Sequence, residues 1–141
     1  MAEYSQSQRL TLALDNHQSY DPSWQLATTI ATAAEERKGE NILLVYVEEV
    51  SYLTDYFILI TSYSKAQAKA IAQSIQESVE KNYQRQPLRI EGQSEGIWIL
   101  VDYGEAIVHI LQPQQREYYN LEAFWGHAQH IPYSSVEPTG E

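Results

Sequence analysis

Hydrophobic positions along this chain follow helical spacing in some segments and strand spacing in others. A first helix is predicted where Asp21 can cap the first turn, Pro22 stands at the first helical position and Gly39 ends the pattern. Apolar residues between them recur every three or four positions, so one face of this helix is expected to lie on a sheet. A second helix is predicted from the N-cap Ser64 to about Tyr83.

Five further runs have the length of a strand and are rich in β-branched, aromatic and aliphatic residues. They are Ile42–Val47, Tyr56–Thr61, Leu88–Glu91, Ile97–Asp102 and Ala106–Leu111. A last helix is predicted from Pro113 to Trp125, and Gly104 is expected to supply a positive φ in the turn between the last two strands.

The predicted element order is α-β-β-α-β-β-β-α, which is an α+β fold with α/β-type layers: a five-stranded mixed sheet covered by helices. The unit from Tyr56 to Glu91 is expected to be a right-handed crossover that makes its two strands parallel. The close connections elsewhere favour antiparallel pairs. Both ends of the chain are polar or rich in turn residues, so residues 1–20 and 127–141 are expected to be flexible tails around a folded domain at 21–126.

Charge and residue usage narrow the function. The chain has 141 residues, a formal net charge of -10 and no cysteine. Disulfides, thiol nucleophiles and cysteine metal sites are therefore excluded. The charge has the wrong sign for binding nucleic acid or an anionic membrane and suits a basic protein surface. Because the first twenty residues lack the apolar segment of a secretory signal and no apolar run could span a membrane, a cytoplasmic location is expected.

The residues that could perform catalysis do not form a recognised pattern. No strand carries the acid-x-acid pair that often holds a catalytic metal, and no cofactor or metal is expected. His109 is the one histidine inside the predicted fold, but a hydrolytic triad with Asp102 lacks a nucleophile motif. A histidine in this context more often packs inside the protein and forms a hydrogen bond.

The strand that ends at Asp102 carries the most informative pattern. Alternation places its residues on two faces of the sheet. One face would carry Ile97, Ile99 and Val101, and the other Trp98, Leu100 and Asp102. If helices cover the first face, the second presents a tryptophan beside an acid, a combination suited to binding a basic protein. Periodicity alone allows equally that Trp98 belongs to the core.

Several short motifs, taken in order, resemble those of the ribosomal silencing factors, also called the Iojap family. The matching stretches are Thr54–Leu59, Thr61–Ser64, Glu91–Gly92, Trp98–Gly104, Val108–His109 and Arg116–Trp125. The resemblance covers roughly residues 22–126. Tyr103 and Phe124 depart from it, since the family commonly has an aliphatic residue and a leucine at these two places.

The resemblance implies a translation repressor, not an enzyme, that binds large-subunit ribosomal protein number fourteen and sterically blocks association of the ribosomal subunits. It also implies a nucleotidyltransferase-like fold without catalytic residues. The implied partner-binding residues are Trp98, Asp102 and Tyr103, with Glu91 adjacent. Four other matching residues have a helical spacing that suits packing of the last helix on the sheet; they are Arg116, Tyr119, Leu121 and Trp125.

Two other functions stay open at this stage. A nucleotidyltransferase-like enzyme or nucleotide sensor would use Asp55, Glu91 and Asp102 around a magnesium ion. An adaptor would present the same sheet surface to another basic protein. A domain with an exposed aromatic face can also self-associate, so a homodimer is compatible with the sequence.

Overall fold

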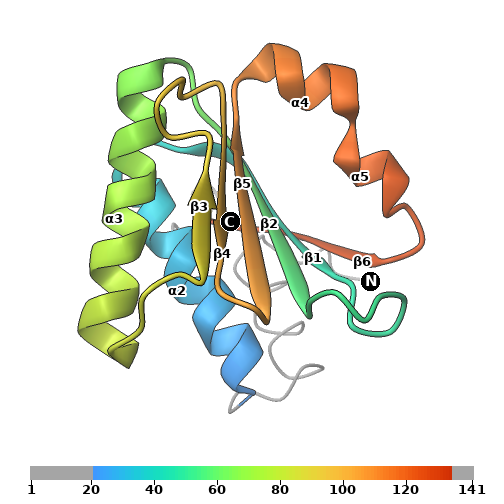
Figure 1. Cartoon of the computed structure of the whole chain (residues 1–141). Helices are drawn as coiled ribbons and strands as arrows, with labels where there is room; N and C mark the ends of the chain where they lie inside the picture. Colours follow the sequence, from blue (N-terminus) through green and yellow to red (C-terminus); the bar gives the residue numbers. More distant parts are fainter. Residues whose placement is uncertain (1–20, 135–141) are drawn as a thin grey trace, which may run out of the picture.

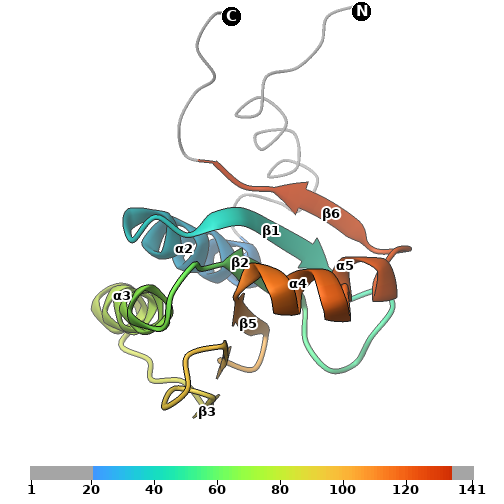
Figure 2. The same cartoon turned by 90° about the horizontal axis from the view of Figure 1, so that it is seen from above.

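The structure is a computed structural model, and it describes residues 21–134. Two long helices, α2 (Pro22–Glu36) and α3 (Lys65–Tyr83), cover one face of a sheet, and two short helices, α4 (Pro113–Tyr119) and α5 (Leu121–Phe124), lie over the other face (Figures 1 and 2). The strands are β1 (Glu40–Tyr46), β2 (Tyr56–Thr61), β3 (Arg89–Glu91), β4 (Trp98–Asp102), β5 (Ala106–Leu111) and β6 (Gln129–Pro132). The α+β class and the predicted order of the first seven elements are confirmed.

These strands form one mixed sheet in the order β3-β4-β5-β2-β1-β6. β2 and β5 are parallel, and the other four pairs are antiparallel. β2 and β3 run in the same direction, as predicted for the crossover through α3, but β5 and β4 lie between them in the sheet. Every residue of the two parallel strands is buried, because helices cover both of their faces.

The prediction of five strands is wrong, since β6 is a sixth. It pairs with the outer edge of β1, from Leu43 opposite Pro132 to Tyr46 opposite Gln129. The strand lies within residues 127–141, which the sequence pattern assigned to a tail. Ile131 is only 5% exposed and belongs to the core on the face covered by α2 and α3. Burial of this side chain and a free edge on β1 explain why a short polar segment adopts strand structure.

The last predicted helix is divided in two at Asn120. This residue has a left-handed conformation, with φ of 47°, which ends α4; its side chain then accepts a hydrogen bond of 3.4 Å from the Ala123 amide at the start of α5. Asparagine adopts this conformation more readily than most residues, so the residue type at this position favours the break. It turns the chain so that α5 lies over the centre of the sheet.

The two long helices begin where their capping residues predict. The Asp21 side chain accepts a hydrogen bond of 3.0 Å from the Ser23 amide, and the Ser64 hydroxyl accepts one of 3.0 Å from the Gln67 amide. α2 ends at Glu36, before the predicted Gly39, because Lys38 already has a positive φ of 68°. Gly104 has a φ of 96°, as expected for the turn between β4 and β5.

Two hydrophobic clusters stabilise the layers, one on each face of the sheet. The larger lies under α2 and α3 and receives Ile99 and Val101 from β4. The smaller lies on the opposite face, where Leu121 and Trp125 pack on the sheet beside Phe57. The predicted alternation is therefore confirmed for the residues of β4: Ile99 and Val101 face the long helices, and the other side chains face the side partly covered by α4 and α5. Ile97, which was predicted on the helix-covered face, precedes β4 and is 41% exposed.

Candidate functional site

Trp98 lies on the side of β4 opposite the long helices. Its side chain is half-buried, and its indole Nε1 donates a hydrogen bond of 3.0 Å to Nδ1 of His109 on the neighbouring strand. The two ring centroids are 5.8 Å apart, and the ring of Tyr119 from α4 lies 4.9 Å from that of Trp98. The polar atom of the indole is thus satisfied inside the protein, and the ring is held in one orientation.

His109 has a structural role beneath Trp98. It is 8% exposed, packs 5.4 Å from the ring of Phe57, and accepts the tryptophan hydrogen bond on Nδ1, so its imidazole is neutral. Burial lowers the pKa of His109 from 6.5 to about 4, because the charged form would be poorly solvated. The prediction that this histidine packs and forms a hydrogen bond is confirmed.

Asp102 and Glu91 lie on the same side of the sheet as Trp98 and are joined by an arginine. Arg89 Nε lies 3.3 Å from an Asp102 oxygen, and Arg89 Nη1 lies 3.1 Å from a Glu91 oxygen. The Glu91 side chain is 58% exposed, so this ion pair contributes little to stability. We refer to Trp98, Leu100, Asp102, Arg89 and Glu91 as the β3–β4 surface. Three of the four residues implied by the family resemblance belong to it.

Tyr103 does not belong to the β3–β4 surface, in contrast to what the family resemblance implies. Its side chain is 1% exposed and is part of the core beneath the long helices. Alternation explains the placement: one residue beyond Asp102, the side chain returns to the face that holds Ile99 and Val101. Burial also raises the pKa of Tyr103 to about 12.

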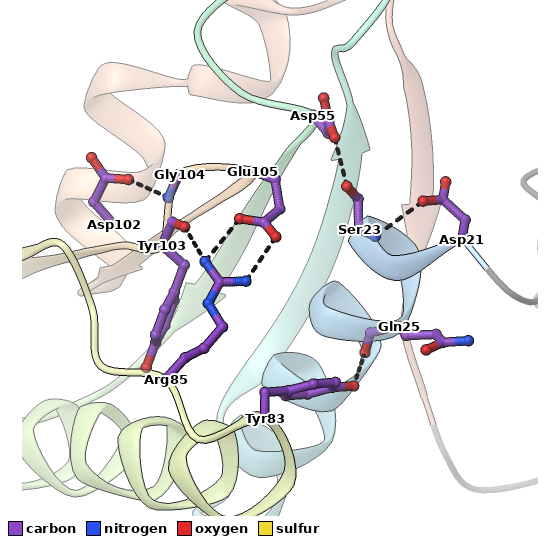
Figure 3. Close-up of polar contacts among 10 residues, drawn as sticks. All are labelled: Asp21, Ser23, Gln25, Asp55, Tyr83, Arg85, Asp102, Tyr103, Gly104 and Glu105. Atoms are coloured by element: carbon purple, nitrogen blue, oxygen red, sulfur yellow. Dashed lines mark hydrogen bonds and ion pairs between the residues drawn. The ribbon is translucent and has the colours of Figure 1, made fainter.

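The turn that carries Tyr103 is held by Arg85, from the segment between α3 and β3 (Figure 3). The Arg85 guanidinium donates to both carboxylate oxygens of Glu105, at 2.7 and 3.0 Å, and to the Tyr103 carbonyl oxygen at 2.7 Å. These bonds to Arg85 lower the pKa of Glu105. On the other side of the turn, an Asp102 oxygen accepts a hydrogen bond of 2.8 Å from the Gly104 amide. The end of the β4–β5 hairpin is therefore rigid.

The residues of the last helices divide into two groups. Arg116, whose side chain is 12% exposed, bonds to Glu122 and Thr61 at 2.9 Å each and fixes α4 above β2. Leu121 and Trp125 pack on the sheet, so the predicted packing role is confirmed for these three residues. Tyr119 differs: it is 52% exposed and contacts Trp98. Helical spacing alone did not distinguish it from its packed neighbours.

The acids proposed for a magnesium site are not assembled into one. The Asp55 carboxylate accepts a hydrogen bond of 2.6 Å from Ser23 at the start of α2 (Figure 3). Asp102 and Glu91 instead form ion pairs with Arg89. Among residues 21–134, no three histidine, aspartate or glutamate side chains are placed to hold a metal ion. None of the helices in this part of the chain is long and apolar enough to cross a membrane. The β3–β4 surface places a fixed aromatic ring and two acids on one side of the sheet, and tryptophan is enriched among the residues that contribute most to protein interfaces.

Comparison with known proteins gives the family. Residues 20–141 match the family model described as "Ribosomal silencing factor during starvation". A ribosomal silencing factor of Bacillus subtilis is 38% identical over 98 residues, covering 70% of this chain and 82% of that protein. The chloroplastic protein Iojap of Zea mays is 37% identical over 102 residues, which is 72% of this chain but 44% of the maize protein. A crystal structure of a Chromobacterium violaceum protein superposes with a TM-score of 0.70 and 31% identity, covering 83% of this chain and 95% of that one.

The class of protein is therefore a non-enzymatic ribosome regulator. The chain belongs to the ribosomal silencing factor family.

Proposed function

We propose that this protein represses translation by binding large-subunit ribosomal protein number fourteen through the β3–β4 surface. In the ribosomal silencing factor family, silencing consists of preventing association of the two ribosomal subunits. A protein seated on the joining face of the large subunit does this by occupying space that the small subunit needs. No chemical step is required, in keeping with the dispersed acids described above.

The observation that carries the proposal is the fixed ring of Trp98 on the same side of the sheet as Asp102 and Glu91. Because the bond to His109 already orders the indole, binding a partner costs little side-chain entropy. Tryptophan is also among the residues that contribute most to protein interfaces. The two acids and the net charge of -10 favour a basic protein, both in approach and in final contact.

The direct test is the affinity of the full chain for purified large-subunit ribosomal protein number fourteen. Trp98→Ala is expected to weaken binding by about 2 kcal/mol or more, the usual effect of removing a central aromatic. Tyr52→Ala is the matched control, since Tyr52 is fully exposed in the β1–β2 loop at the other end of the sheet from α4 (Figure 1). A folded Trp98→Ala protein that binds like the parent would contradict the site.

A second variant is needed because Trp98→Ala removes the donor to the buried His109 acceptor and could destabilise the fold. Glu91→Gln changes an exposed side chain and is expected to weaken binding a few-fold without changing the melting temperature. Binding of a different basic protein in place of this partner would support the adaptor function. A joint increase in melting temperature with magnesium and a nucleoside triphosphate would support a nucleotide sensor.

Two finer points belong to the same proposal. We place the site of action in the cytoplasm by analogy with the bacterial relatives, although the maize relative is chloroplastic by name. We also expect a homodimer, if it forms through the β3–β4 surface, to compete with the ribosomal partner for the same residues.

A further inference from the structure

Helix α4 carries two adjacent tyrosines that do not belong to the hydrophobic core. None of its seven residues is buried, and Tyr118 and Tyr119 are 79% and 52% exposed. An amphipathic helix normally lies on the core through an apolar stripe. α4 is instead held by the polar bonds of Arg116 to Thr61 and Glu122. Packing on the sheet therefore does not explain why this helix presents aromatic side chains.

The two tyrosines continue the aromatic surface that begins at Trp98. The Tyr119 ring lies 4.9 Å from Trp98 at an interplanar angle of 52°, and the Tyr118 ring meets Tyr119 edge-on at 4.9 Å. Three rings thus extend from β4 onto α4. Because His109 holds Trp98 and Arg116 holds α4, this row is ordered before any partner arrives.

The charges around the row favour a cationic ligand. Glu91 lies on the sheet side, opposite Leu100 and therefore diagonal to Trp98, and Glu117 is exposed next to Tyr118 on α4. Arg89 offsets part of this charge, which leaves the surroundings negative. The planar guanidinium of arginine stacks on aromatic rings and bonds to carboxylates at the same time, whereas the ammonium of lysine does so less well. A second copy of this chain is a poorer occupant, because it would bring like charges together.

We propose that the Trp98–Tyr119 pair receives an arginine side chain of the basic partner, and that Tyr119 is a specificity-determining residue of the interface. This inference rests on the proposed function, because the partner is the same ribosomal protein. It extends the site from the sheet to α4 and identifies the side chain that the aromatic row recognises.

The first test measures affinity for large-subunit ribosomal protein number fourteen with variants of the full chain. Tyr119→Ala is expected to weaken binding about tenfold, within the range of interface aromatics, and Tyr119→Phe to leave it within about twofold because the ring is kept. Tyr52→Ala, the exposed-tyrosine control, is expected to bind like the parent. Tyr119→Ala binding at parent affinity, while Trp98→Ala loses binding, would overturn this inference and leave the proposed function intact. Failure of the parent itself to bind would instead reject the proposed function.

The second test separates recognition from mere support of Trp98. Two peptides of equal length and charge, one of alternating Arg-Gly and one of alternating Lys-Gly, compete with the ribosomal protein for binding to this chain. The arginine peptide is expected to displace the ribosomal protein from the parent several-fold more effectively than the lysine peptide. The Tyr119→Ala variant is expected to lose this preference. Equal competition by both peptides with the parent would overturn the arginine assignment. If Tyr119→Ala dissociates a homodimer but keeps the preference for the arginine peptide, Tyr119 serves self-association instead, and the inference is overturned.

Discussion

Lowering the pH from 7 to about 5 is expected to destabilise the protein by about 2 kcal/mol through a single group, His109. In the unfolded chain this histidine has the ordinary pKa of 6.5, and in the folded protein burial lowers the pKa to about 4. As the pH falls below 6.5, the unfolded state binds a proton that the folded state does not accept. Acid therefore favours unfolding. The loss continues down to the folded pKa, where the full shift corresponds to about 3 kcal/mol.

The assay is urea unfolding of the full chain at both pH values, followed by circular dichroism. His109→Gln removes the titrating ring but keeps an oxygen that can accept the Trp98 Nε1 hydrogen bond, so its stability is expected to change little over the same interval. His127→Gln is the matched control, because His127 is exposed and its replacement should leave the parent's pH dependence intact. A His109→Gln protein that still loses about 2 kcal/mol would refute the reasoning.

Two further predictions concern the turns that follow β3 and β4 and the β3–β4 surface itself. Gly92→Ala is expected to cost more than about 2 kcal/mol in urea unfolding, because φ is 82° and a Cβ would lie 2.0 Å from the Trp98 carbonyl oxygen. Gly104→Ala, with a φ of 96° but no atom nearer than 3.5 Å, should cost only about 1 kcal/mol, and equal losses would contradict the steric argument. Arg89→Gln removes the positive charge that pairs with Asp102 and Glu91, so it should strengthen binding to the basic ribosomal protein a few-fold, mainly through faster association in stopped-flow measurements. Slower association would show instead that Arg89 itself contacts the partner.

Local patterns predicted most of the fold because the deciding interactions are local. The caps at Asp21 and Ser64 bond to amides within three residues, and the alternation in β4 follows from strand geometry alone. The strand β6 was not predictable in the same way. Its stability comes from pairing with β1, which precedes it by more than eighty residues, and its own composition resembles a tail.

In the candidate site, the burial of Tyr103 could have been predicted from the sequence, but the exposure of Tyr119 could not. Extending the alternation of β4 by one residue places Tyr103 with Ile99 on the core side, so its burial could have been predicted. Asn120 likewise offered a reason to divide the last helix. The exposure of Tyr119 could not have been predicted, because it depends on how α4 is positioned over the sheet. That position is set by tertiary contacts such as the hydrogen bond between Arg116 and Thr61.

The most direct test of the central claim is a subunit-joining experiment on sucrose gradients. The full chain is mixed with separated large ribosomal subunits, and small subunits are then added under conditions that allow joining. The account predicts that the protein sediments with the large subunit, that the peak of joined ribosomes falls, and that Trp98→Ala restores it. Joined ribosomes forming at the same yield with saturating parent protein would contradict the account.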